Sequence, residues 1–249
     1  MTTNGRTNTD TMAARVERGD KHMNTKNLIR WSGLAAMGAG IIFAGIQPIH
    51  PLDVLSSVTT PQWAIIQSLK TAMCLLGLLG LAGLYTRQVK EAGWLGLAGY
   101  LLFSLFFAHT LAFAFAEAFI LPLLATEAPT FVEGFLGIFN GHPTEFNLGV
   151  LPALYSLAGV GYVLGGLLFG IATLRAGILP RWAAGLLAVG AVAPFVLAVL
   201  PHPLDRTFAV PMGIALAGLG YALWSERREQ ASDPVPGSGS PQLRQTAAE

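Results

Sequence analysis

The sequence predicts an all-α integral membrane protein in which six transmembrane helices form three in–out–in hairpins with a pseudo-threefold internal repeat. Three observations support this fold class: 53% of the residues are hydrophobic and only 12% charged, the charges gather between long apolar segments, and one tetrapeptide pattern occurs three times. A soluble domain carries about twice this share of charged residues. The net charge of +1 comes without a basic cluster, so no nucleic acid is expected, and the lipid bilayer is the predicted partner.

Six apolar segments are each long enough to cross a hydrocarbon core, which needs about 20 helical residues. They cover residues 28–49, 62–85, 92–124, 149–174, 181–200 and 207–224. The first is long for the apolar part of a signal peptide, and no A-x-A cleavage site follows it, so we expect it to be retained. Residues 1–26 and 227–249 are polar, and we expect both to be disordered cytoplasmic tails.

The basic residues between the apolar segments predict the orientation. The second and fourth connections contain the basic residues Arg87, Lys90, Arg175 and Arg181. The other three connections contain a single basic residue, Arg206. Because basic loops stay in the cytoplasm, both termini are predicted to be cytoplasmic and the odd-numbered connections to lie outside. The expected location is a bacterial-type plasma membrane, crossed several times. Tryptophans fall at both predicted boundaries, as in an aromatic belt: Trp31, Trp94, Trp182 and Trp224 inside and Trp63 outside.

A tetrapeptide of the form HPx[DE] recurs in the three outer connections, at His50–Asp53, His142–Glu145 and His202–Asp205. A second proline follows each histidine 9 to 11 residues later, at Pro61, Pro152 and Pro211. Trp31, Trp94 and Trp182 each begin an odd-numbered helix. These features predict three copies of one hairpin around a pseudo-threefold axis along the membrane normal.

The middle hairpin carries extra sequence that includes residues 127–141. Phe131, Phe135 and Phe139 recur at four-residue spacing, which places them on one helical face. We expect a short helix over the outer surface, anchored by these phenylalanines, where it could act as a lid.

The repeated tetrapeptide has two interpretations. In the first it only starts helices, because proline suits the first helical position and an acid favours the positive end of the helix dipole. In the second, His50, His142 and His202 line a shared outer site. Three imidazoles form the ligand set of an open zinc site, and Asp53, Glu145 and Asp205 could orient them. Without metal, the same residues could bind a polar substrate or a proton.

Two ionisable residues lie deeper, and such residues inside a membrane are costly and usually face a cavity or a partner. Glu117 is the candidate for a fourth ligand or a proton carrier; alternatively, the third helix overshoots the bilayer and Glu117 meets water. His109 is expected to bond to a neighbouring helix or to contribute to the site. Lys70 could pair with Glu117, but snorkelling outward is the favoured expectation.

Three functions remain open from the sequence. The first is a transporter or small-ligand-binding protein with an outward-facing polar site. The second is a zinc-dependent membrane hydrolase that uses the three outer histidines. The third is a structural or assembly protein without a site. Gly166 and Gly170 form a GxxxG pair, which is compatible with close helix packing or a homo-oligomer.

Overall fold

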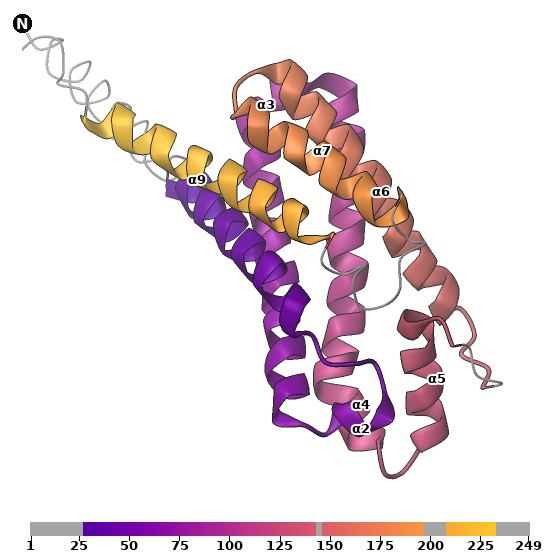
Figure 1. Cartoon of the computed structure of the whole chain (residues 1–249). Coiled ribbons are helices and arrows are strands. Elements are labelled where there is room, and N and C mark those ends of the chain that lie inside the picture. The colour runs from indigo at the N-terminus through magenta and orange to yellow at the C-terminus, as the bar shows by residue number, and fades with distance from the viewer. Residues whose placement is uncertain (1–26, 143–145, 197–207, 233–249) are drawn as a thin grey trace, which may run out of the picture.

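The computed structural model describes residues 27–142, 146–196 and 208–232, and every regular element in these ranges is helical (Figure 1). The first helix continues into a 3₁₀ turn, η1 (Gln47–Ile49), and spans Asn27–Ile49 in total. The remaining elements are α2 (Leu55–Val58), α3 (Pro61–Phe115), the π-helix η2 (Ala116–Ile120), α4 (Leu121–Leu124), α5 (Pro129–Asn140), α6 (Leu151–Ala176), α7 (Arg181–Val196) and α9 (Val210–Ser232).

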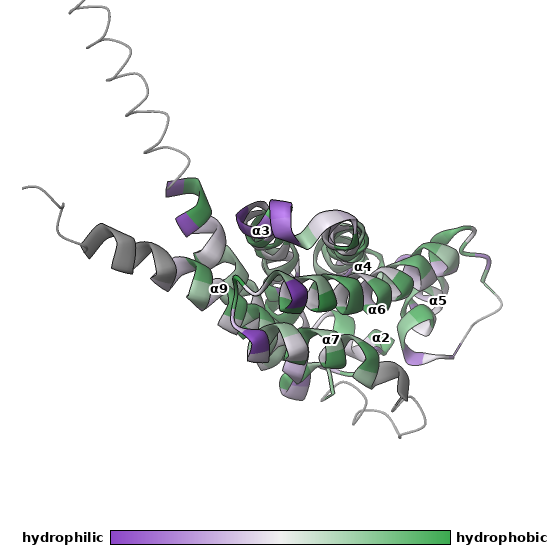
Figure 2. Cartoon of the chain, turned by 90° about the horizontal axis from the view of Figure 1, so that it is seen from above, coloured by the Kyte–Doolittle hydropathy of each residue, from purple (hydrophilic) through white to green (hydrophobic). Residues whose placement is uncertain are grey.

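Among the described residues, three helices are long and apolar enough to cross a membrane: Asn27–Ile49, Pro61–Leu124 and Leu151–Ala176. Two shorter apolar helices, Arg181–Ala193 and Val210–Ser225, accompany them. Apolar residues occupy most of the helical ribbon when the bundle is viewed from above (Figure 2). The prediction of an all-helical protein with membrane-length apolar helices is therefore confirmed for the described residues.

Helix α3 folds back on itself. Its backbone leaves the helical conformation at Gln88 and at Gly93, where φ is +55°, a value that glycine adopts without a Cβ penalty. Tyr85 and Tyr100 stack with ring centroids 4.7 Å apart, so a first arm (residues 61–87) and a second arm (residues 94–115) run antiparallel. The chain thus reverses at the charged segment 86–91, where the sequence predicts a connection. At this reversal the Gln88 amide donates to the Thr173 hydroxyl of α6 at 2.8 Å.

Successive helices pack through glycines, and every neighbouring pair is antiparallel. A Cβ on Gly80 would meet Ala36 of the first helix, one on Gly99 would meet Phe169 of α6, and one on Gly170 would meet Ala188 of α7. The same holds for Gly190 against Met212 of α9 and for Gly213 against Ala44 of the first helix. The contacts therefore close a ring in the order first helix, first arm, second arm, α6, α7, α9.

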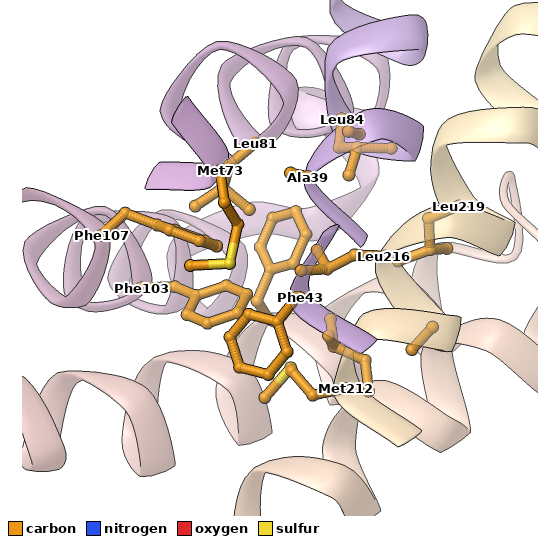
Figure 3. Close-up of a cluster of buried hydrophobic side chains, with 14 of the residues drawn as sticks. Ala39, Phe43, Met73, Leu81, Leu84, Phe103, Phe107, Met212, Leu216 and Leu219 are labelled. Carbon is orange, nitrogen blue, oxygen red and sulfur yellow. The ribbon is translucent and has the colours of Figure 1, made fainter. Parts of the chain in front are cut away.

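Apolar side chains fill the centre of this ring. Buried side chains from the first helix, both arms of α3 and α9 meet in one cluster, which includes Phe43, Met73, Phe103, Phe107 and Leu216 (Figure 3). Where these side chains meet, the ring therefore encloses a packed apolar core. Polar groups inside the bundle must lie above or below this cluster along the helices.

Two ends of the bundle can be distinguished in Figure 1. The turns at residues 88–93 and 177–180 lie at one end, called here the Gly93 end, and α2, α4 and the start of α5 lie at the other, called the α5 end. Trp31, Trp94 and Trp182 are 69%, 85% and 59% exposed, as a belt requires. Trp63 is fully buried, so its assignment to the belt is wrong.

Replacement of Gly165 by alanine tests the close helix packing. Its Cβ would overlap the backbone of Phe103, and we expect Gly165→Ala to lower the free energy of unfolding by about 1–3 kcal/mol. Gly159, on the same helix, has nothing within 4 Å of a built Cβ. Gly159→Ala is the matched control and should leave stability unchanged or raised, because alanine favours helix. Thermal unfolding in detergent measures both, and equal melting temperatures would contradict this packing.

Candidate functional site

The first arm of α3 presents one buried seam to the rest of the bundle. The residues of this seam follow one another at intervals of four and three positions in turn, from Trp63 to Gln88. This spacing is typical of helices that pack side by side. Toward the Gly93 end the seam is apolar, with Leu81 and Leu84 fully buried. Toward the α5 end it contains Trp63, Gln67, Lys70 and Cys74, called here the polar seam, in which Gln67 is fully buried and Lys70 is 17% exposed. The apolar Ile66 and Met73 are buried on the same arm.

Lys70 of the first arm and Glu117 of η2, which continues the second arm, form an ion pair. The Lys70 Nζ lies 2.6 Å from the Glu117 Oε2, and the side chains are 17% and 1% exposed, respectively. The pair is thus inside the protein, with the lysine on the more accessible side. The expectation that Lys70 snorkels outward is wrong, and Glu117 is buried by protein rather than exposed beyond the third helix. Removing one partner of a buried ion pair typically costs about 3–5 kcal/mol, because the other charge stays buried and unpaired.

A π-helical turn places the Glu117 side chain, and Pro122 explains this turn. In an α-helix the carbonyl of Glu117 would accept from Leu121, but the Leu121 amide bonds to Ala116 instead. The next residue is Pro122, which has no N–H to donate. The Glu117 carbonyl thus has neither helical donor, and the indole N–H of Trp63 supplies one at 2.8 Å. Trp63 therefore stabilises the distorted turn that aims Glu117 at Lys70.

Gln67 lies between these two contacts on the same face of the first arm, because it follows Trp63 by four residues and precedes Lys70 by three. Its side chain is fully buried, and neither its Nε2 nor its Oε1 has a hydrogen-bond partner among the described residues. A buried polar group without a partner costs about 1–3 kcal/mol. Native proteins satisfy most such groups, so this exception needs an explanation.

Helix α5 packs beside the polar seam. In Figure 1 it runs back along the bundle next to the start of α6. Phe139 lies 5.9 Å from the Lys70 Nζ and packs edge-on against Phe113 of the second arm and Tyr155 of α6. At the end of α5, the Asn140 amide donates to the Asp53 carbonyl at 2.9 Å. The segment with the periodic phenylalanines thus forms an apolar wall of the site.

The predicted site residues are placed as follows. His50 is half-buried, lies 6.5 Å from the Trp63 ring, and has its Nδ1 2.8 Å from the Pro51 carbonyl. His142 is exposed, and its backbone amide donates to Asn140. Since Asn140 also bonds to the backbone of Asp53, His142 lies near the first HPx[DE] loop. The remaining residues, Glu145, His202 and Asp205, lie outside the described residues.

His109 bonds within its own helix, with Nδ1 2.9 Å from the Leu105 carbonyl, rather than to a neighbouring helix as expected. The zinc hypothesis needs His202, which the described residues do not include. In residues 27–142, 146–196 and 208–232, no three His, Cys, Asp or Glu side chains group as metal ligands would.

Sequence reasoning missed Gln67 and Trp63 as members of the site. The signal that could have found them is the spacing of Trp63, Gln67, Lys70 and Cys74, which is that of a buried seam yet contains polar and ionisable residues. Pro122, five residues after Glu117, is the second signal, because it removes a backbone donor inside an apolar helix.

The fold and the buried pair together define a helical membrane protein with an ionisable site inside its bundle, and the membrane-length helices indicate a membrane location. In comparisons with protein families, with curated proteins and with solved structures, nothing matched this chain.

Removing the indole donor tests the role of Trp63. We expect Trp63→Phe to lower the free energy of unfolding by about 1–3 kcal/mol, because the buried Glu117 carbonyl would lose the hydrogen bond that the indole donates. Trp94→Phe is the control, since Trp94 is 85% exposed. Chemical unfolding in mixed micelles measures both. Equal losses in the two variants would show that the indole bond does not hold the turn.

Proposed function

We propose that this protein is a multi-pass membrane transporter that binds a small polar solute at the site formed by Gln67, Lys70 and Glu117. The observation that carries the proposal is the buried Lys70–Glu117 ion pair beside a fully buried carboxamide without a partner. Ionisable groups within membrane-spanning segments are costly and mark ion and substrate pathways in many membrane proteins.

The Gln67 carboxamide favours solute binding over a structural role. A residue selected only for packing at this seam position would be apolar, as Leu81 and Leu84 are further along the same arm. A carboxamide offers two N–H donors and one carbonyl acceptor. A polar solute that bonds to these atoms would remove the desolvation cost that the unliganded protein bears.

The proposed topology places the site near the outer face. Arg30, Arg87, Lys90, Arg175 and Arg181 belong to the Gly93 end, so we propose that this end faces the cytoplasm. The ring of antiparallel helices supports the proposal of six crossings with both termini inside. This ring order is also the one that three hairpins around a pseudo-threefold axis require, which supports the proposed repeat.

The α5 end would then face outward, with the first HPx[DE] loop, His142 and α5 around the polar seam. His50 contacts Trp63, so the first loop adjoins the bond that holds the Glu117 turn. Transport requires that such a site open alternately to the two faces. The π-turn is a place where the second arm could rearrange, because π-bulges often occur at functional sites in helices.

Replacement of Gln67 by leucine separates binding from folding. We expect Gln67→Leu to raise the melting temperature of the unliganded protein, since an unpartnered buried amide is replaced by an apolar group of similar size. The same variant should lose binding of any polar solute that stabilises the wild type in a thermal-shift screen of sugars, amino acids, carboxylates and amines. Stability and binding should therefore change in opposite directions.

Gln62→Leu is the matched control, because Gln62 is an exposed glutamine on the same arm. It should keep the solute response of the wild type. A Gln67→Leu variant that melts lower than the wild type would contradict the unpartnered state of the amide. Absence of any stabilising solute across the screen would refute the proposed function and favour the structural alternative.

A further inference from the structure

We infer that a cavity at the Gly93 end of the bundle binds the phosphate group of an anionic membrane lipid. The cavity has a volume of about 390 Å³ and lies between the turn that joins α6 to α7 and the C-terminal half of α9. Arg181 is the charged residue that lines it. The polar seam lies toward the other end of the bundle, so the two sites are separate.

Two short segments of chain build the cavity. Helix α6 ends at Gly177, whose φ of +67° turns the chain sharply, and α7 begins four residues later at Arg181. The turn and Arg181 form one side of the cavity, and Ala222 and Ser225 of α9 form the other. Ala222 and Ser225 are three residues apart and therefore lie on the same face of their helix.

The lining combines apolar walls with a donor for an anion. The apolar lining residues are Ile178, Leu179, Pro180 and Ala222. The Ser225 hydroxyl already donates to the Ala222 carbonyl at 3.1 Å, so Arg181 is the side-chain donor that remains for a ligand. A guanidinium can donate two parallel hydrogen bonds to a phosphate. A phosphate joined to an apolar body matches both parts of this lining, and a membrane lipid has this chemistry.

Arg181 is available to bind an anion. Its side chain is exposed, and it has no carboxylate partner among the described residues. Arg30, at the same end, instead lies over the Trp224 ring at 6.0 Å. An exposed arginine on a flat surface is usually only solvated, but Arg181 adjoins a cavity whose size is within the range of ligand pockets, about 300–1,000 Å³. An anion can therefore bind there without breaking an internal ion pair.

The charge around the cavity also favours an anionic ligand. In the sequence, the segment after Ser225 adds one net positive charge, because it reads Glu226, Arg227, Arg228. The described charged residues of the Gly93 end are five basic and one acidic: Arg30, Arg87, Lys90, Arg175, Arg181 and Glu91. Basic pockets between membrane helices bind anionic lipid headgroups.

The exposure of Trp182 favours a lipid over a soluble phosphate compound. Trp182 follows Arg181 directly and is 59% exposed, as is typical of tryptophans at the level of the lipid headgroups. Arg181 would then lie at the level where lipid phosphates are present at high local concentration. A soluble phosphate ester has the same charge but lacks the apolar part that the cavity walls would contact.

Three probes distinguish these ligands: dihexanoyl phosphatidylglycerol, dihexanoyl phosphatidylcholine and glycerol 3-phosphate. Each is titrated into the purified full-length protein after lipid removal in a neutral detergent. Thermal shift measures the stabilisation, and native mass spectrometry counts the bound molecules. We expect one phosphatidylglycerol to bind more tightly than phosphatidylcholine, because the choline cation offsets the phosphate charge. Glycerol 3-phosphate should bind most weakly, because it has no acyl chains.

Variants locate the site. Arg181→Gln should weaken phosphatidylglycerol binding at least about tenfold, since it removes a charge-assisted hydrogen bond. Arg175→Gln is the matched control, because Arg175 is an exposed arginine at the same end that does not line the cavity. Both variants should melt as the wild type does without lipid. Ala222→Leu keeps Arg181 but fills the cavity, so it should also weaken binding.

Four results would overturn the inference. Equal losses in Arg175→Gln and Arg181→Gln would show a diffuse attraction of the basic end rather than a site. Unchanged binding in Ala222→Leu would place the lipid outside the cavity. Glycerol 3-phosphate that binds as tightly as phosphatidylglycerol would assign the cavity to a soluble phosphate compound. Absence of phosphatidylglycerol binding would refute the site outright, and the proposed function at the polar seam would be unaffected.

Discussion

The contact between Lys70 and Glu117 is the constraint on which the α5 end of the bundle depends. Two opposite charges can lie inside an apolar protein only when they are held together, since either one alone would bear a large desolvation cost. The fold-back at residues 88–93 brings the two partners to the same level. Pro122 removes a backbone donor and favours the π-turn, and Trp63 then bonds to the freed carbonyl. A proline, an indole and an ion pair thus form one connected arrangement between the first arm of α3 and the η2–α4 segment that continues the second arm.

The rest of the bundle is held together by close helix contacts and apolar packing rather than by ion pairs. Glycines let neighbouring helices approach at the backbone, and large apolar side chains fill the centre of the ring (Figure 3). Toward the Gly93 end the seam is closed by Leu81 and Leu84, and the Gln88 amide is bonded to Thr173. At the Gly93 end the Gln88 amide N–H is thus bonded while its carbonyl oxygen has no partner among the described residues, whereas both polar atoms of Gln67, toward the α5 end, lack one there.

The sequence predicted those features that depend on the average character of a segment. Apolar length predicted the helices, the charges of residues 86–91 predicted where α3 reverses, and four-residue spacing predicted the phenylalanine face of the helix now seen as α5. Features that depend on one contact between distant residues were not predictable in this way. Trp63 is a residue type typical of an aromatic belt, and the Lys70 side chain is long enough to snorkel. Both instead bond to Glu117 across the fold-back, and this contact holds them inside the protein. For Glu117 the sequence left two positions open, inside the protein or in water beyond the end of the third helix. Hydropathy alone cannot distinguish these positions, and the structure shows the first. The grouping of His50, His142 and His202 stays a prediction, since His202 lies outside the described residues.

A double-mutant cycle on Lys70 and Glu117 tests the central claim most directly. Unfolding in mixed micelles would be compared for the wild type, Lys70→Met, Glu117→Gln and the combined variant. If the charges are paired and buried, each single change should cost about 3 kcal/mol or more. The combined change should then cost less than the sum of the two, with a coupling free energy of about 1–3 kcal/mol. Costs that add within about 0.5 kcal/mol would contradict the pair, and with it the site built around it.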